Sequence, residues 1–294
     1  HVRAIGKRAN TTGGPKETVQ RVHDRSCRVG DSEAAKPSHP VANAYQPSKR
    51  NSGAICGVEA LSRWYHPVRG TISPSEFIQI AENNGIIIAL GDRVIEKAID
   101  AALHMPGDTK IGINVSPLQL HSTRLLTLMT EQLDKTGIDP SRIELEITES
   151  VFLSDNAFIL DRLRRLKDLG VRIAMDDFGT GFSSLVYLQR FPFDKLKLDQ
   201  AFVRDLETND QSRAIARATI TMAHALNLTV TAEGVENEVQ ARFLREQGCD
   251  ELQGFLYSRP QDQSALIPYL RSMEMVHQAQ ARSEANNIVE MKRK

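Results

Sequence analysis

Residues 142–177 have the sequence RIELEITESVFLSDNAFILDRLRRLKDLGVRIAMDD, which contains one complete strand–helix–strand repeat. Residues 142–148 alternate apolar and polar side chains as a strand does. Ser154 is the expected N-cap of a helix over 155–169, and Gly170 stands where such a helix stops. A second strand follows at once. The stretch predicts an α/β fold in which neighbouring strands run parallel.

The same alternation continues on both sides of this repeat. Helices are expected from about residue 75, over 91–104 and from 117 to about 135. Further strands are expected at 53–61, 111–115, 195–199, 229–234 and 251–255. Seven or eight such units favour a TIM-like (β/α) barrel, which typically needs ~250 residues, over an open doubly wound sheet. Open doubly wound sheets are typically marked by a glycine-rich nucleotide-binding loop, GxGxxG or GxxxxGKS/T, after a strand. No such loop follows any predicted strand here, which argues against the open sheet.

The composition is that of a globular chain, with 40% hydrophobic and 25% charged residues among 294. No window approaches the ~20 uninterrupted apolar residues of a membrane span, so no membrane contact is predicted. Three cysteines without a CxxC pair indicate neither a disulfide framework nor a thiolate zinc site. They fit a reducing, cytoplasmic location.

Residues 1–41 differ from the rest of the chain. They lack apolar periodicity and are rich in Gly, Ser, Pro, Lys and Arg, which predicts a basic linker or disordered segment. Residues 1–50 hold ten Lys and Arg against four Asp and Glu, leaving 27 against 33 for the remainder. The folded part is acidic, so binding to long nucleic acid is not expected. The start at His1 rather than Met suggests a fragment, with any regulatory domain outside it.

Carboxylates and amides stand late in successive predicted strands, and function in a barrel gathers at that end. The polar residues at these positions are Glu59, Asn114, Glu146, Glu149, Asp176, Asp177, Lys197, Asp199, Glu233, Glu236 and Gln253. A single acid at a strand end is usually a helix cap or a solvated residue. Caps, however, scatter among Ser, Thr, Asn and Asp, whereas glutamate, a poor cap, recurs here. Oxygen ligands converging on one mouth predict a site for a hard cation.

Divalent cations explain why such acids stand together, because adjacent carboxylates raise one another's pKa unless a cation neutralises them. Two ions, Mg²⁺ or Mn²⁺, would activate water and stabilise both oxygens of a phosphodiester under attack. Asp176 and Asp177 are suited to bridge two ions. Lys197 would neutralise charge on the reacting phosphate or orient the water, although a lysine in an amphipathic strand is more often solvated.

Seven motifs follow one another along the chain: Glu59-Ala60-Leu61 with Arg63-Trp64, Asn114-Val115-Ser116, Glu146-Ile147-Thr148-Glu149, DDFGTG at 176–181, Lys197-Leu198-Asp199, AEGVE at 232–236, and Gln253-Gly254-Phe255. In this order they resemble the motifs of the EAL family of cyclic di-GMP phosphodiesterases. The resemblance places a barrel domain at 42–272, with its match clear from 53, and a helical tail at 273–294. It implies a homodimer and metal-dependent hydrolysis of cyclic di-GMP to linear 5′-pGpG.

Carried over by position, the resemblance implies roles for single residues. The implied ligands of one ion are Glu59, Asn114, Glu146 and Asp176, and those of the second are Asp176 and Asp177. Glu233 would assist at the metal–water cluster. Lys197 and Gln253 would lie beside the attacking water, and Arg63 with the backbone of Leu61 would hold substrate phosphate.

Two further assignments depend on loops and on the first strand. Glu149 would support the loop at 178–185, which is similar to one used for dimer contacts. Tyr45-Gln46-Pro47 resembles the family's first strand, but residues 48–52, SKRNS, lack the expected apolar pair, and the connection is about one residue short. Either the first strand is distorted or another segment replaces it. Gln46 is a substrate contact only if the strand forms, and an unpaired barrel edge would expose backbone groups.

Two alternatives to an enzyme stay open. A cyclic di-GMP receptor without turnover usually lacks metal ligands, and none is missing here. An interaction module with a defective first strand would fold poorly or gain no stability from the ligand.

Overall fold

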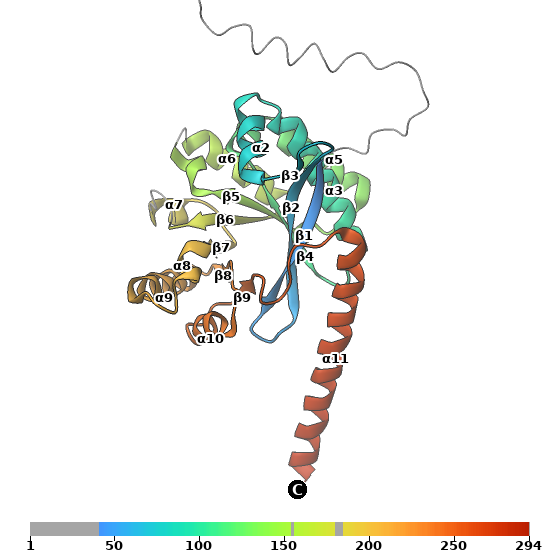
Figure 1. Ribbon diagram of the computed structural model, residues 1–294, viewed down its shortest axis with the longest axis vertical. Helices are drawn as coiled ribbons and strands as arrows, with labels where there is room; N and C mark the ends of the chain where they lie inside the picture. Colours follow the sequence, from blue (N-terminus) through green and yellow to red (C-terminus); the bar gives the residue numbers. More distant parts are fainter. Residues whose placement is uncertain (1–40, 154–155, 180–184, 294) are drawn as a thin grey trace, which may run out of the picture. The chain divides into compact units, whose positions relative to one another are not determined.

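The computed structural model describes residues 41–153, 156–179 and 185–293. In these ranges one sheet has the strand order β1-β9-β8-β7-β6-β5-β4-β2-β3, and a pairing of β1 with β2 closes it into a barrel (Figure 1). The short strand β3 pairs only with β2 and lies outside the closed ring. The strands are β1 (Val41–Arg50), β2 (Ile55–His66), β3 (Gly70–Ile72), β4 (Lys110–Asn114), β5 (Ile143–Thr148), β6 (Arg172–Phe178), β7 (Lys195–Leu198), β8 (Thr229–Ala232) and β9 (Glu251–Gln253). The predicted barrel is confirmed.

The barrel is mixed, which corrects the expectation of parallel neighbours at one strand. From β2 round to β9 the neighbouring strands of the ring pair in parallel, whereas β1 runs antiparallel to both β2 and β9. The reason lies in the connection. Strands joined by a short turn pair antiparallel, and Arg50 and Ala54 close such a turn through a 2.9 Å backbone hydrogen bond.

The first strand forms in spite of its unusual sequence. β1 pairs with β2 along nearly its whole length, with a bulge after Ser48. On its other side β1 pairs with β9, and Tyr45 exchanges two backbone hydrogen bonds of 2.7 and 2.9 Å with Gln261. The irregularity of residues 48–52 is therefore absorbed by a bulge. The barrel edge is paired, and Gln46 stands opposite Glu59.

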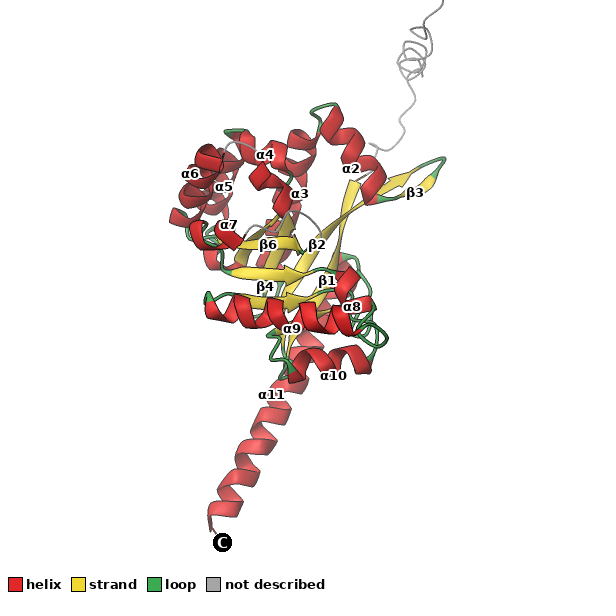
Figure 2. Cartoon of the chain, turned by 90° about the vertical axis from the view of Figure 1, so that its left-hand side faces the viewer, coloured by secondary structure: helices red, strands yellow, loops and turns green. Residues whose placement is uncertain are grey.

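The helices lie outside the strands (Figure 2). They are α2 (Pro74–Asn83), α3 (Ile87–His104), α4 (Pro117–His121), α5 (Arg124–Thr136), α6 (Asn156–Asp168), α7 (Leu185–Arg190), α8 (Gln200–Arg204), α9 (Asp210–Ala225), α10 (Glu238–Glu246) and α11 (Gln263–Arg293), with 3-10 turns η1 (Pro140–Arg142) and η2 (Glu149–Leu153). Among the described helices, none combines the length and apolarity that crossing a membrane requires. α11 continues through residue 273, and the division into domains stays a prediction.

Helix ends follow the local chemistry, with one correction. The single helix expected from 117 to about 135 is two helices, because Ser122 is extended (φ −82°, ψ 143°) and its hydroxyl accepts from the backbone N–H of Arg124. Gly137 ends α5 in the left-handed region (φ 64°), as predicted. The expected cap Ser154 lies outside the described residues.

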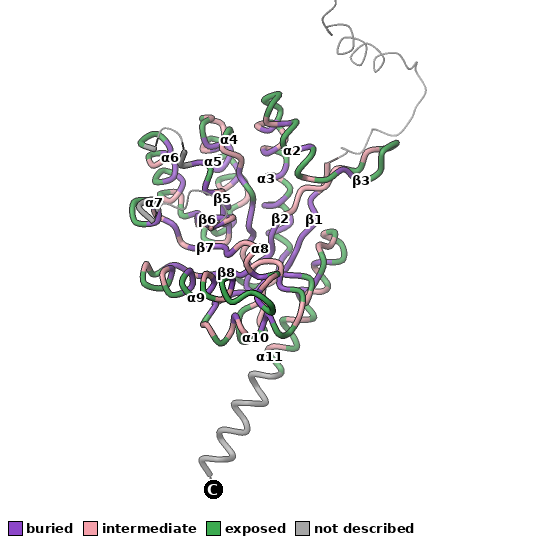
Figure 3. The backbone as a smooth tube through the Cα atoms, turned by 60° about the vertical axis from the view of Figure 1, so that its left-hand side comes forward, coloured by how far each residue is buried: buried purple, intermediate pink, exposed green. Residues whose placement is uncertain are grey.

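The fold has two separate buried regions, one between the helices and the strands and one inside the barrel. Between helices and strands the core is apolar, and Figure 3 shows buried stretches along α3. Ile95, Ala98 and Ile99 of this helix have no exposed surface. Inside the barrel the buried side chains are largely charged. Glu146 and Lys197 are 4% and 2% exposed.

Candidate active site

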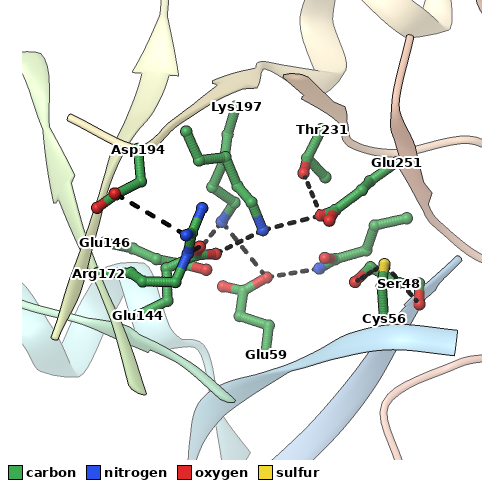
Figure 4. A network of polar contacts seen from close by, with 12 residues as sticks. Ser48, Cys56, Glu59, Glu144, Glu146, Arg172, Asp194, Lys197, Thr231 and Glu251 are labelled. Carbon is green, nitrogen blue, oxygen red and sulfur yellow. Dashed lines mark hydrogen bonds and ion pairs between the residues drawn. The ribbon is translucent and has the colours of Figure 1, made fainter. Parts of the chain in front are cut away.

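The parallel strands of the ring bring one cluster of polar side chains together at the mouth of the barrel. It contains Glu59 (β2), Asn114 (β4), Glu146 (β5), Asp176 (β6), Lys197 (β7), Glu233 directly after β8, and Gln253 (β9). Figure 4 shows Glu59, Glu146 and Lys197 pointing toward one another inside the barrel. All seven were predicted from the sequence to meet at this end.

Lys197 lies at the centre of the cluster. Its Nζ is 2.6 Å from a carboxylate oxygen of Glu146 and 2.6 Å from one of Glu233. The same ammonium lies 3.3 Å from Asp176 and 3.7 Å from Glu59. One ammonium group therefore lies within 3.7 Å of four carboxylates. Lys197 is thus buried among acidic side chains and is not a solvated lysine.

The carboxylate of Glu59 is held by hydrogen bonds from two other strands of the barrel. Asn114 donates from Nδ2 to one carboxylate oxygen at 2.7 Å, and Gln253 donates from Nε2 to the other at 2.5 Å. These bonds join β2 to β4 and β9. Because both oxygens accept, the orientation of the Glu59 carboxylate is fixed before any ligand arrives.

Asp176 and Asp177 are placed by an irregularity in β6. The pairing with β7 shifts register between Met175 and Phe178. Asp177 has φ 54°, in the left-handed region that aspartate tolerates better than most residues, and its N–H donates to Asp176 Oδ1 at 3.0 Å. A bulge of this kind re-aims side chains, so it brings two consecutive carboxylates to the mouth.

Crowding and burial raise the pKa of several of these acids. Burial, opposed by Lys197, raises the pKa of Glu146 well above its usual value and that of Glu233 to about 8. Burial also raises the pKa of Asp177 to about 6. For Glu59 burial acts in the same direction, but its ion pair with Lys197 and its hydrogen bonds hold the pKa below the usual value. A single ammonium does not balance the carboxylates around it.

Gly112 makes room for one of these carboxylates. A Cβ on Gly112 would stand 2.1 Å from Oε1 of Glu146, closer than any real contact. We expect Gly112→Ala to push Glu146 away from Lys197 and lower turnover in the assay described below by about a hundredfold, the usual effect of a misplacement near 1 Å. Gly57→Ala is the matched control, because the closest contact of its Cβ would be the Ser48 hydroxyl at 3.1 Å, and its contacts with Lys110, at 3.7 and 3.9 Å, are of ordinary van der Waals length. Equal activity of the two variants would contradict this explanation.

Two cavities flank the cluster and share Leu61 and Arg63. One, of about 430 Å³, extends from Asn114 and Glu146 to apolar residues of α2 and α3. The other, of about 340 Å³, contains Glu59, Glu233 and Gln253 with Gln46, Phe255 and Pro260 on its wall. Gln46 lies on the wall of the second cavity, and its amide donates to the carbonyl of Ser258 at 3.0 Å. Its role as a substrate contact stays a prediction.

Some contacts had no signal in the sequence. Ser116, the N-cap of α4, donates to Glu82 of α2 at 2.6 Å, which ties the turn after Asn114 to a distant helix. The Arg259 guanidinium stacks 4.3 Å over the exposed Phe255 ring at the second cavity. Such pairs join residues far apart in sequence or depend on loop geometry, so periodicity could not find them.

The remaining sequence predictions lie at or beyond the edge of the site. Glu149 is buried at the start of η2, next to the cluster-bearing strand β5. The loop that it was predicted to support includes residues 180–184, which lie outside the described residues. Trp64 lines neither cavity and packs edge-on against Phe77, 6.0 Å between ring centres.

The chemistry of the donors fits divalent cations. The six predicted ligands offer oxygen atoms to a metal ion, and the surplus negative charge of their carboxylates favours a cation. In the part of the chain that the structure describes, no group of three or more His, Cys, Asp or Glu stands ready to hold a metal ion. Four of the carboxylates lie within 3.7 Å of the Lys197 ammonium instead.

Comparison with known proteins identifies the family. Residues 37–260 match the EAL domain. The chain therefore belongs to the EAL domain family, as its motifs indicated, and is related to cyclic di-GMP phosphodiesterases.

Relatives and solved structures agree with this. An uncharacterized signaling protein of Caulobacter vibrioides is 53% identical over 223 residues, 76% of this chain and 28% of that protein. The chain spans about a third or less of the curated relatives it matches. The structure described as PaMucR phosphodiesterase in a c-di-GMP complex has 38% identity and a TM-score of 0.74, and covers 77% of this chain and 94% of that one. BlrP1 of Klebsiella pneumoniae, a manganese and cyclic di-GMP complex, has 30% identity and a TM-score of 0.67, with 77% and 57% covered.

Proposed function

We propose that this domain hydrolyses cyclic di-GMP to linear 5′-pGpG with the help of two divalent cations. The observation that carries the proposal is the placement of the carboxylate cluster between two cavities that share Leu61 and Arg63. Cyclic di-GMP has a phosphodiester ring with a guanine on either side. Its ring would lie over the cluster with one base toward each cavity, and both cavities fall in the range of about 300–1,000 Å³ typical of ligand sites.

The roles of the side chains follow from their positions. Glu59, Asn114, Glu146, Asp176, Asp177 and Glu233 would hold the ions. Mg²⁺ or Mn²⁺, when bound, would neutralise these acids, promote deprotonation of water and balance charge on the phosphodiester. Lys197 would then be free to orient the water or meet the developing phosphate charge, together with Gln253. Arg63, whose Nη1 donates to the Ser62 carbonyl at 2.9 Å, would hold a phosphate oxygen at the mouth.

One observation favours a second candidate, a receptor that binds cyclic di-GMP without turnover. Lys197 already pairs with four of the proposed ligands. If these ion pairs persist in the presence of metal, the cavities would bind the ligand while the water is never activated.

Turnover by the purified chain separates the two candidates. With Mn²⁺ or Mg²⁺ we expect chromatography to show 5′-pGpG, and EDTA is expected to lower the rate by about a hundredfold or more, since metals contribute several kcal/mol to such reactions. Restored turnover on adding Mn²⁺ back controls for damage by the chelator. A folded chain that forms no product, yet gains about 2.7 kcal/mol of stability at a hundredfold excess of ligand over Kd, would be a receptor.

The homodimer, the cytoplasmic location and the regulatory domain stay predictions. The curated relatives are longer than this chain, which is consistent with a role as one part of a larger signalling protein.

A further inference from the structure

A second set of charged residues lies inside the barrel beneath the proposed active site. Lys195 Nζ is 2.6 Å from Glu144 and 2.8 Å from Glu251, and the three side chains are 3–6% exposed (Figure 4 shows both glutamates). We call Glu144, Lys195 and Glu251 the basal triad. Thr231 donates to Glu251 at 2.9 Å, and Arg172 lies 3.4 Å from Glu144.

Each member of the basal triad stands two residues before a member of the upper cluster on the same strand. Glu144 precedes Glu146 on β5, Lys195 precedes Lys197 on β7, and Glu251 precedes Gln253 on β9. Residues two apart on a strand share a face. Each triad residue therefore lies one step deeper in the barrel than its partner in the cluster.

The triad connects strands that are not neighbours. β6 separates β5 from β7, and β8 separates β7 from β9. β5, β7 and β9 share no backbone hydrogen bonds that would fix their positions relative to one another along the barrel axis. The two short ion pairs of Lys195 cross the barrel and link these three strands directly. Alternate strands usually contribute a layer of branched apolar side chains at this depth, and here the layer is ionic.

The two layers line one small cavity. The cavity between them is only about 10 Å³, and its wall includes Glu144, Lys195, Glu146 and Lys197. A space of that size holds at most about one water, so movement of one layer is transmitted to the other. Burial by itself lowers the pKa of Lys195, but Glu144 and Glu251 raise it above the usual value, so Lys195 stays charged.

We propose that Glu144, Lys195 and Glu251 are positioning residues that hold β5, β7 and β9 at the heights at which Glu146, Lys197 and Gln253 meet. The inference rests on the proposed function for its catalytic consequence. Apolar residues would fill the same space with less desolvation cost, but they lack the direction and fixed length of an ion pair.

The test is the combined variant Glu144→Gln/Lys195→Met/Glu251→Gln, which removes every charge of the triad while keeping side-chain size. Removing all charges of a buried network leaves no unpaired charge among its members, which is the main cost of removing one partner alone. We expect kcat for cyclic di-GMP and the calorimetric affinity for Mn²⁺ each to fall about 10- to 100-fold, as for other outer-shell changes, with KM nearly unchanged. The single variant Glu251→Gln, which keeps the Lys195–Glu144 pair, decides the question if the combined variant does not fold.

The control is Arg93→Met/Glu96→Gln, which removes an exposed ion pair of 3.6 Å on α3 and is expected to change neither quantity. A folded triad variant with kcat and Mn²⁺ affinity within twofold of the unaltered chain overturns the proposal. If the unaltered chain itself forms no 5′-pGpG, the proposed function fails, and the Mn²⁺ affinities alone then decide whether the triad positions the cluster.

Discussion

Replacing Glu59 with alanine is expected to abolish metal-dependent turnover of cyclic di-GMP while the chain stays folded. Glu59 accepts from Asn114 and Gln253 and approaches Lys197, so it joins three of the other cluster residues. Its loss removes a proposed metal ligand and also the carboxylate that orients the side-chain amides of Asn114 and Gln253. We expect kcat/KM to fall by about a thousandfold or more, which corresponds to about 4 kcal/mol of transition-state stabilisation.

The fold is expected to tolerate Glu59→Ala because the cluster holds surplus negative charge. Removing one carboxylate forfeits two hydrogen bonds but also relieves repulsion, so the free energy of unfolding is expected to change by no more than about 2 kcal/mol. Chemical denaturation measures this, and Glu96→Ala on the exposed side of α3 serves as the control. Turnover within tenfold of the unaltered chain would show that Glu59 is not a metal ligand.

Lys197→Met is expected to produce the largest loss of stability. The substitution leaves Glu146, Glu233, Asp176 and Glu59 without their shared cation, and breaking a buried ion pair costs about 3–5 kcal/mol. We expect that loss in the free energy of unfolding at pH 8 in EDTA. Mn²⁺ is expected to restore much of it, because the metal would supply the missing positive charge to the same carboxylates.

The pH dependence of this loss has a definite sign. The pKa of Glu146 lies above its usual value, as does that of Glu233 at about 8, so protonation of these acids stabilises the fold at low pH. This contribution is lost as pH rises through the folded pKa. The variant is therefore expected to be closer in stability to the unaltered chain at pH 5 than at pH 8. Equal stability of the two chains at pH 8 in EDTA would mean that Lys197 does not neutralise the cluster.

The order of strands and helices could be predicted because each repeat carries its own signals. The alternation at 142–148 and the left-handed Gly137 and Gly170 are local features, and the structure has them where expected. Two features of the fold were not predictable in the same way. The break at Ser122 depends on a hydrogen bond from the Arg124 backbone to the Ser122 hydroxyl, and the antiparallel direction of β1 depends on its pairing with β2 and β9.

The members of the site were predictable for a similar reason, whereas their partners were not. In a barrel the carboxyl ends of the parallel strands meet at one mouth. The location of an acidic residue late in such a strand can therefore be predicted from the sequence alone. Which acid faces Lys197, and at what distance, depends on side-chain packing across the barrel. The catalytic and metal-binding roles stay predictions that the variants described above test.

The sequence by itself determined the strand–helix repeats, the EAL family and the residues that gather at the barrel mouth, because these depend on periodicity and on chemistry at fixed positions. Only the tertiary structure decided that Lys197 stands among four carboxylates, that Gly112 leaves room for Glu146, and that the basal triad lies beneath them. The physical reason is that each of these contacts joins strands distant in sequence, and its energy depends on burial and distance that exist only after the barrel closes.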